Sequence, residues 1–202
     1  MEFPRAAPDT ASNKKFWKLR NRRIAKAPPV ELTSKDLVPV KVIFADQKYP
    51  SAIPTQEKIA EMFRVFARHA SIFDDSVRTA GFFWKMFSAP DTMVWEVPGR
   101  AVYYITEIIP GHMAFVHLIV YNKDAMRQYG LVRDLIRTVM DHPMLQLKRV
   151  NAFIPASNHK AIWFARTIGF RREACLRQWT MRNGELINMI GLGLLRKELE
   201  DG

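Results

Sequence analysis

The sequence has little cysteine, few and scattered histidines and no long apolar run, and each shortage excludes a class of protein. With Cys175 as the single cysteine among 202 residues, an internal disulfide framework is impossible, so we expect a reducing, cytoplasmic compartment. The five histidines show no spacing typical of a zinc site, and we expect no bound metal. No apolar run approaches the roughly 18 residues that cross a bilayer, and the start of the chain lacks a signal-peptide core, so we expect no transmembrane segment.

Apolar residues and positive charge are abundant, at 48% of the chain and a net charge of +11. The apolar fraction is typical of a folded globular protein and too high for a disordered chain. The charge is uneven, because residues 1–35 hold nine Lys and Arg against three Asp and Glu, which is more than half of the excess. We therefore expect two parts, a basic arm over residues 1–38 and one folded domain over residues 39–202.

The arm combines dense positive charge with large apolar side chains. Seven cations fall within residues 14–26 without one acid, and the flanking prolines favour extended chain over helix. Lys and Arg neutralise phosphates and aromatic rings stack on bases, so the pattern suits nucleic acid. An acidic protein groove, an anionic membrane surface or a merely solvated tail remains an alternative. The candidate partner-binding residues are Lys14, Lys15, Phe16, Trp17, Lys18, Arg20, Arg22, Arg23 and Lys26.

The periodicity beyond residue 39 predicts a mixed α/β domain, with a mostly antiparallel sheet flanked by helices. We expect strands over residues 40–44, 93–97, 101–108, 113–121 and 150–154, and a final hairpin of residues 170–182 and 186–195. The Asn183-Gly184 dipeptide is the turn of that hairpin. We expect helices over residues 56–70, capped by Thr55, over residues 74–87 and over residues 130–141, and a fourth that Asn158 caps and Gly169 ends.

The last of these helices carries a family resemblance. The run from Asn158 through Ala161 to Gly169 and Phe170 follows a strand and has the form N-x-x-A … G-F. Together with the order of the predicted elements, it resembles the GNAT superfamily, the Gcn5-related N-acetyltransferases. The continuation of the run to Arg177 has the form G-F-x-x-E-x-x-L-R, which is similar to the ribosomal-protein N-terminal acetyltransferase branch. The resemblance implies an acetyl-CoA-dependent enzyme that transfers an acyl group to an amine.

The resemblance also implies where acetyl-CoA would bind. In the family the cofactor lies where the fourth and fifth strands diverge, and the turn after the fourth strand carries Arg/Gln-x-x-Gly-x-Gly/Ala, whose backbone N–H groups hold the pyrophosphate. In the matching residues 127–132 the Arg and the central Gly are present, but Gln128 replaces a common glycine and Val132 the last small residue. The expected cofactor-binding residues are Leu118, Ile119, Val120, Arg127, Gln128, Tyr129, Gly130, Leu131, Val132 and Asn158.

The two departures have physical consequences. Glycine lets a phosphate approach the backbone without a Cβ atom, whereas a β-branched Val132 at the start of a helix would place bulk where the anion should dock. We therefore expect a degenerate cofactor motif. The alternative for residues 127–132 is an ordinary turn between a strand and a helix.

The catalytic groups are less well marked. Many members of the family use a Tyr as general acid at the position of Ala165, although the branch named above often lacks it, and an Asp of the family is replaced here by Asn188. The candidate bases are Glu107 and His117. His117 lies in an apolar run, where we expect it to titrate near neutral pH and to act through a water molecule.

Each of these residues has a structural alternative. His117 could be a half-buried residue bonded to a backbone carbonyl, and Glu107 a solvated acid on the flank of a strand. Cys175 is expected to pack in the interior rather than to act as a nucleophile.

Two functions from different classes remain open at this point. The first is a GNAT-type N-acyltransferase acting on a protein or small-molecule amine, with activity that is weak or lost if the motif is too degenerate. The second is a non-catalytic protein that keeps the GNAT scaffold, such as a phage virion or nucleoprotein component, anchored in an assembly by its basic arm.

Overall fold

The computed structural model describes residues 36–42, 55–67, 80–120 and 129–200. The chain divides into two units, Met1–Glu31 and Leu32–Gly202, and every described element belongs to the second. The basic segment 14–26 and all its candidate partner-binding residues lie outside the described residues. The division into an arm over residues 1–38 and a domain over residues 39–202 stays a prediction.

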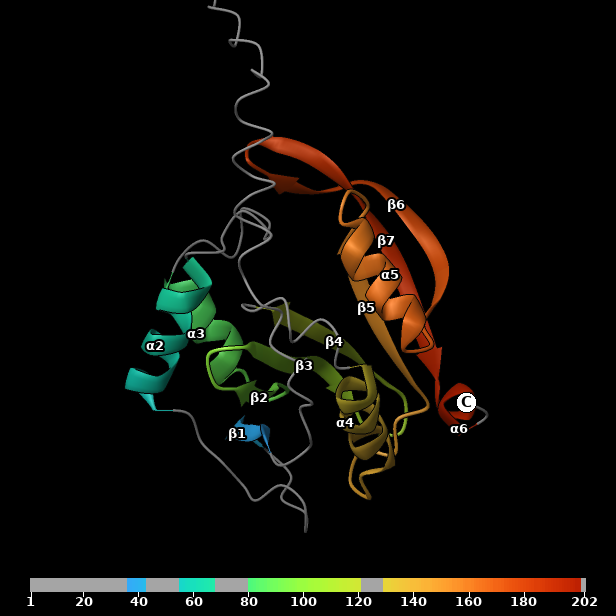
Figure 1. The fold of residues 1–202 in the computed structure, drawn as a ribbon, viewed down its shortest axis with the longest axis horizontal. Helices are drawn as coiled ribbons and strands as arrows, with labels where there is room; N and C mark the ends of the chain where they lie inside the picture. The colour runs from blue at the N-terminus through green and yellow to red at the C-terminus, as the bar shows by residue number, and fades with distance from the viewer. Residues whose placement is uncertain (1–35, 43–54, 68–79, 121–128, 201–202) are drawn as a thin grey trace, which may run out of the picture. The chain divides into compact units, whose positions relative to one another are not determined.

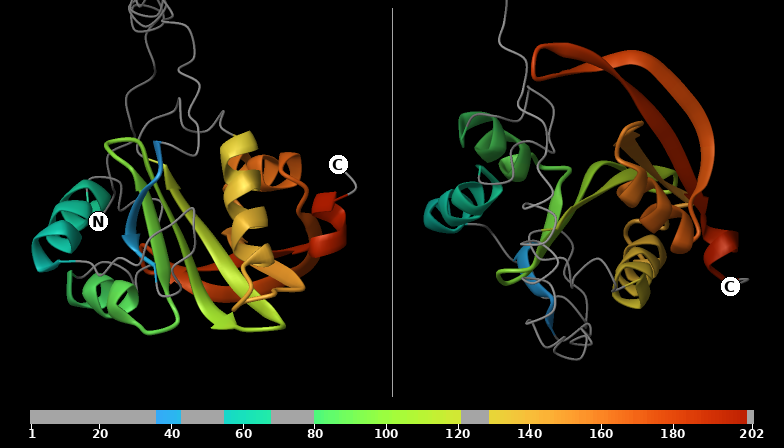
Figure 2. Two further views of the ribbon diagram at one scale, coloured as in Figure 1. Left: turned by 90° about the horizontal axis from the view of Figure 1, so that it is seen from below. Right: turned by 45° about the horizontal axis from the view of Figure 1, so that its top comes forward.

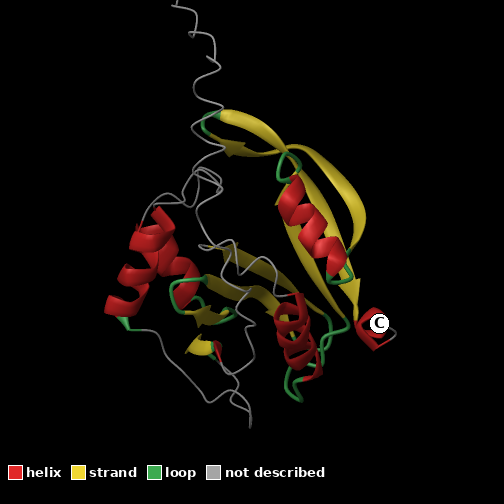
Figure 3. Cartoon of the chain, viewed as in Figure 1, coloured by secondary structure: helices red, strands yellow, loops and turns green. Residues whose placement is uncertain are grey.

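Seven strands form one sheet in the order β1-β2-β3-β4-β5-β7-β6 (Figures 1 and 3). The pairing of β4 with β5 is parallel and every other pairing is antiparallel. The predicted mixed, mostly antiparallel sheet is therefore confirmed. The strands are β1 (Val38–Lys41), β2 (Met93–Val97), β3 (Ala101–Ile109), β4 (Met113–Val120), β5 (Arg149–Pro155), β6 (Arg171–Arg182) and β7 (Glu185–Leu195).

The helices cover the two faces of the sheet (Figure 2). The helices are α2 (Gln56–Ala67), α3 (Ala80–Ser88), α4 (Tyr129–Asp141), α5 (His159–Thr167) and α6 (Arg196–Glu200). Because side chains alternate along a strand, Val94 and Val102 belong to the core beneath α2 and α3, whereas Trp95 and Tyr103 belong to the core beneath α4 and α5. We call these two sides the α2–α3 face and the α4–α5 face. The short α6, which follows β7 directly, was not predicted from the sequence.

Helix α5 shows why local sequence predicted this part of the fold well. The Asn158 side-chain oxygen accepts the N–H of Ala161 at 3.2 Å, as an N-cap should. At the other end the N–H of Gly169 bonds to the Arg166 carbonyl at 3.1 Å and the N–H of Phe170 to the Ala165 carbonyl at 3.0 Å. These two bonds form a Schellman motif, which Gly169 permits with a φ of +115°. Both predicted ends of the helix are confirmed.

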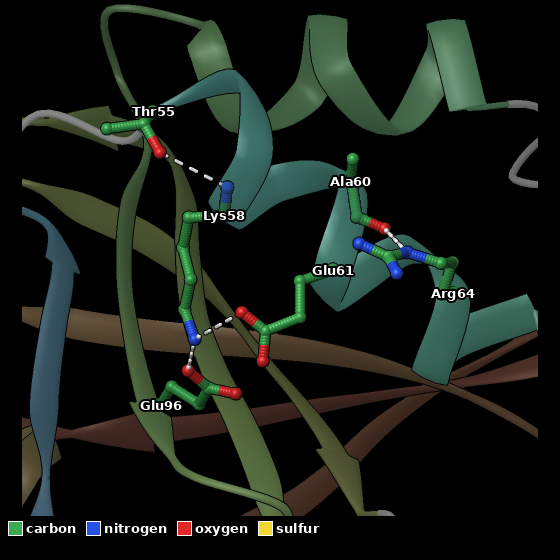
Figure 4. A network of polar contacts seen from close by, with 6 residues as sticks. All are labelled: Thr55, Lys58, Ala60, Glu61, Arg64 and Glu96. Carbon is green, nitrogen blue, oxygen red and sulfur yellow. Dashed lines mark hydrogen bonds and ion pairs between the residues drawn. The ribbon is translucent and has the colours of Figure 1, made fainter.

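Helix α2 is tied to the sheet by an ion pair that reaches into the interior (Figure 4). The Thr55 hydroxyl oxygen accepts the N–H of Lys58 at 3.1 Å, which confirms the predicted cap. The Lys58 ammonium then lies 2.5 Å from a carboxylate oxygen of Glu96, a buried residue of β2, and 3.4 Å from Glu61. Partial burial lowers the pKa of Lys58, but the hydrogen bond and charge of Glu96, aided by Glu61, outweigh burial and raise it. The buried carboxylate is thus compensated by a full positive charge.

Candidate functional site

Strands β4 and β5 part after a short parallel contact. They pair at three positions only, where Met113, Ala114 and Phe115 face residues 149–151. On its outer side β4 continues to pair with β3 as far as Val120, and β5 continues with β7 as far as Pro155. We call the diverging segments, residues 116–120 and 152–155, the strand fork. In the described part of the chain their inner edges have no strand partner, so backbone donors and acceptors border the fork on both sides.

The start of α4 lies beside α5, so the helices that follow the two diverging strands meet. The ring of Tyr129, the first residue of α4, lies 5.1 Å from the ring of Phe164 and 5.8 Å from that of Trp163. The next residue, Gly130, is exposed, and a Cβ atom built there would have nothing within 4 Å. The first N–H groups of a helix lack partners inside it. The first turn of α4, beside the fork, therefore has an exposed residue without a side chain, Gly130.

Val132 does not occupy this open position. Only 6% of Val132 is exposed, and it packs in the core beneath α4 together with Leu131 and Leu135. The prediction that Val132 places bulk where an anion would dock is therefore wrong, because the helical turn directs position 132 inward and position 130 outward. The other two motif residues, Arg127 and Gln128, lie outside the described residues.

The remaining predicted cofactor-binding residues occupy different environments. Leu118 and Val120 pack partly buried against the core of the α4–α5 face, while Ile119 is buried on the α2–α3 face. All three share the β4 edge of the fork, so any common contact with a ligand would be through their backbone. The Asn158 side chain is engaged in capping α5. A role in cofactor binding stays a prediction for all four residues.

His117 lies on the α2–α3 face in a tightly packed environment. Its ring stacks on that of Tyr104 at 4.4 Å, with 8° between the planes, and its Nε2 shares a 2.9 Å hydrogen bond with the Thr106 hydroxyl. Burial lowers the pKa of His117 to about 4, so the prediction of titration near neutral pH is wrong. Tyr104 and Thr106, which hold this ring, were missed, although their two-residue spacing along a predicted strand places them on one face.

Glu107, the second candidate base, lies at an irregularity of β3. Its φ is +49°, and the register between β3 and β4 shifts between Thr106 and Ile109. The side chain is exposed. This bulge lies next to the end of β4 that is paired with β5, away from the open end of the fork, so Glu107 does not join His117, which lies on the β4 edge of the fork, in one constellation. A catalytic role for either residue stays a prediction.

Three further positions can be placed. Ala165 is buried in the core beneath α5, so a packing residue stands where many family members have a tyrosine. The Asn188 side-chain oxygen accepts the N–H of Gln178 at 2.8 Å, across the part of the hairpin where β6 leaves its register. Cys175 is exposed on the edge strand β6. The prediction of a packed Cys175 is therefore wrong.

An aromatic row that was missed in the sequence crosses the α2–α3 face beyond the helices. The Phe115 ring lies 5.2 Å from that of Phe153, which lies 6.2 Å from that of Trp179. Gly191 of β7 makes room for this row, because an added Cβ atom would come within 3.3 Å of the Phe153 ring. Phe153 and Trp179 remain 38% and 59% exposed, and the exposed Met181 and Leu186 continue along the hairpin. The row begins at Phe115, where the strands part, and extends outward.

The described residues contain neither a candidate metal site nor a candidate membrane-spanning helix. No group of three or more His, Cys, Asp or Glu side chains there is arranged to hold a metal ion. No described helix has the length and apolar character needed to cross a membrane.

Comparison with solved structures identifies the fold. Spermidine N-acetyltransferase from Vibrio cholerae, in complex with CoA and spermine, matches with a TM-score of 0.59 and 13% identity over 82% of this chain and 99% of that one. RimJ from Mycobacterium smegmatis, in complex with CoA-disulfide, matches with a TM-score of 0.56 and 14% identity over 72% and 80%. No protein-family model matches the sequence, and no curated protein matches it. The described domain therefore has the fold of the GNAT acetyltransferases.

The packed imidazole of His117, stacked on Tyr104 and bonded to Thr106, predicts a specific dependence of stability on pH. Its pKa is 6.5 in the unfolded chain and about 4 in the folded one, so between these values the unfolded state binds more protons. The contribution is fully present above pH 6.5 and is lost as the pH falls toward 4, by up to about 3 kcal/mol. Urea unfolding between pH 4 and 7 should show a shallower slope for His117→Asn than for the wild type. The exposed His112→Asn is the control, and equal slopes for both variants would refute the assignment.

Proposed function

We propose that the protein is an acetyl-CoA-dependent N-acyltransferase of the GNAT type. The observation that carries the proposal is the strand fork with the start of α4 beside it, where exposed Gly130 leaves open space in front of the backbone. Peptide groups along a strand edge can bond to the amide groups of a pantetheine arm. The positive end of a helix can bind a pyrophosphate.

The residues present fit acetyl-CoA. A Cβ atom added at position 130 would meet no atom within 4 Å, so glycine leaves open space at this exposed residue of the first turn of α4. The packing of Leu131 and Val132 in the core holds this turn in place. Residues 129–132 would bind the pyrophosphate and residues 116–120 the pantetheine arm. The cofactor, when bound, supplies an activated acyl group as a thioester, and the backbone of the fork orients it toward the acceptor.

The acceptor nitrogen must be uncharged when it attacks the thioester carbonyl. His117 is a poor base for this purpose because burial lowers its pKa to about 4. An α-amino group, with a pKa of about 7.7–8.0, is already roughly one-third neutral at pH 7.5, whereas a Lys side chain with a pKa of about 10.4 is neutral in roughly one molecule in a thousand. The site therefore suits a polypeptide N-terminus better than a lysine or a polyamine.

The aromatic row supports the same class of acceptor. Its outer rings are exposed, Phe153 by 38% and Trp179 by 59%, whereas a small-molecule site usually encloses most of its ligand. Residues 171–188 hold four Arg and two Glu, and Glu173 is paired with Arg149 at 2.6 Å. Such a surface repels a polycation and accepts apolar residues. We infer an acceptor whose first residues are large and apolar.

A non-catalytic role in an assembly was the alternative function. It depended on the basic arm, which lies outside the described residues, and on a degenerate cofactor motif. The inward position of Val132 removes one of the two reasons for expecting that degeneracy. No observation on the described residues favours the alternative.

Binding of acetyl-CoA is the first test of the proposal. Isothermal titration should detect binding to the wild type. Gly130→Ala should lower the affinity about tenfold or more, because its methyl group would compete with the bound pyrophosphate for the open space at this residue. The same change should leave stability unchanged or raise it by up to about 1 kcal/mol, since alanine favours helix. Gly81→Ala, another exposed helical glycine with free space, is the control. The absence of both binding heat and a thermal shift at millimolar acetyl-CoA would contradict the proposal.

Acceptor choice is the second test. With acetyl-CoA as donor, release of the CoA thiol should give a higher kcat/KM for a peptide beginning with Phe or Leu than for the same peptide beginning with Gly or for spermidine. Trp179→Ala should lower kcat/KM for the apolar peptide about fivefold or more, by loss of a stacking surface. Met144→Ala, at an exposed residue outside the row, should leave it unchanged. Preference for spermidine would contradict the inferred acceptor while leaving the acyltransferase proposal intact.

A further inference from the structure

Trp163 is an exposed aromatic residue at a position where the fold does not require one. Its side chain projects from α5 and remains 60% exposed, although Phe164 and Ala165 beside it are buried in the core. An indole is the largest apolar side chain, and leaving it in water forfeits the stabilisation that its burial would give. Phe164 and Ala165 pack α5 against the core, so the exposed part of Trp163 is available for a contact outside the core.

The position of Trp163 is defined by the start of α4. Its ring meets that of Tyr129 at 5.8 Å with 83° between the planes, a T-shaped contact of the two rings. Tyr129 directly precedes Gly130, where the space in front of the backbone is open. The indole is therefore held next to the turn proposed for the pyrophosphate. Its orientation is set by a neighbouring ring and not by a ligand.

A positive charge accompanies the indole on α5. Lys160 lies three residues before Trp163, which places the two side chains on one side of the helix. Lys160 is exposed, and no described acid is paired with it in an ion pair. A flat aromatic surface next to a cation is the combination that binds a nucleobase carrying a phosphate.

We propose that Trp163 is the stacking platform for the adenine ring of acetyl-CoA and that Lys160 faces its 3′-phosphate. The inference rests on the proposed function and adds to it the part of the site that binds the nucleotide end of the cofactor. The indole stacks on the base through its exposed surface, beside its contact with Tyr129. The strand fork and Gly130 bind the other end of the same molecule, so the two parts of the site act on separable portions of one ligand.

This separation allows a direct test with two ligands. Acetyl-CoA contains the adenosine 3′-phosphate portion, whereas S-acetyl-4′-phosphopantetheine is the same thioester without it. In isothermal titration, Trp163→Ala should weaken the binding of acetyl-CoA between about fivefold and a hundredfold, the range for loss of one base–aromatic stack. It should leave the affinity for S-acetyl-4′-phosphopantetheine unchanged. Trp163→Phe should retain most of the affinity for acetyl-CoA.

Two controls make the assignment specific. Trp84→Ala removes another exposed indole, 41% exposed, from α3, away from both proposed sites, and should change the affinity for neither ligand. Lys160→Gln should weaken the binding of acetyl-CoA but not of its 3′-dephospho form, and the difference should shrink at high salt. Quenching of tryptophan fluorescence by acetyl-CoA should be reduced in Trp163→Phe relative to the wild type.

The other outcomes contradict the proposal in distinguishable ways. Normal affinity of Trp163→Ala for acetyl-CoA would overturn the stacking role while leaving the acyltransferase function in place. Equal weakening of both ligands would show that Trp163 supports the shape of the site and does not bind the base. Normal affinity with an altered sedimentation coefficient would assign the indole to contact between two copies of the chain. Failure of the wild type to bind either ligand would overturn the proposed function as well.

Discussion

The early end of the pairing between β4 and β5 is the constraint on which the rest of the structure depends. Each strand is paired on its outer side along its length, β4 with β3 across one register shift and β5 with β7, but the two share only three residue pairs with each other. Backbone groups in the middle of a sheet are normally satisfied by the next strand. Here the inner edges of residues 116–120 and 152–155 lack a strand partner in the described part of the chain. The helices that follow the two strands meet through Tyr129, Trp163 and Phe164.

Under the proposed function, this geometry would let the backbone of the described residues contribute to a site for an anionic cofactor. Helix α4 turns Val132 and Leu131 into the core and leaves Gly130 outside. The fork provides strand edges, and the start of α4 provides the positive end of a helix. The chemistry that remains for the side chains is modest, because the thioester is already activated and an α-amine is partly neutral near pH 7.5. A neutral His117 stacked on Tyr104 is compatible with a site in which the backbone binds the cofactor and no side chain has to act as a strong base.

Local chemistry predicted the parts of the fold that local interactions determine. Asn158, Gly169 and the Asn183-Gly184 turn each act within a few residues, and the structure confirms the helix ends and the hairpin. The errors at Val132, His117 and Cys175 have another origin, because the direction of a side chain depends on what packs against its element. The aromatic row could not be predicted, since Phe115, Phe153 and Trp179 meet only after the four strands β4, β5, β7 and β6 have paired.

The central claim is that the strand fork and the start of α4 together bind acetyl-CoA. Hydrogen–deuterium exchange of the full chain, with and without the cofactor, tests it most directly, because exchange reports the opening of individual backbone segments. The account predicts slower exchange in peptides covering residues 116–120 and 129–132, and little change in the distal hairpin around residues 180–187. Protection confined to other segments, or none at saturating acetyl-CoA, would contradict it.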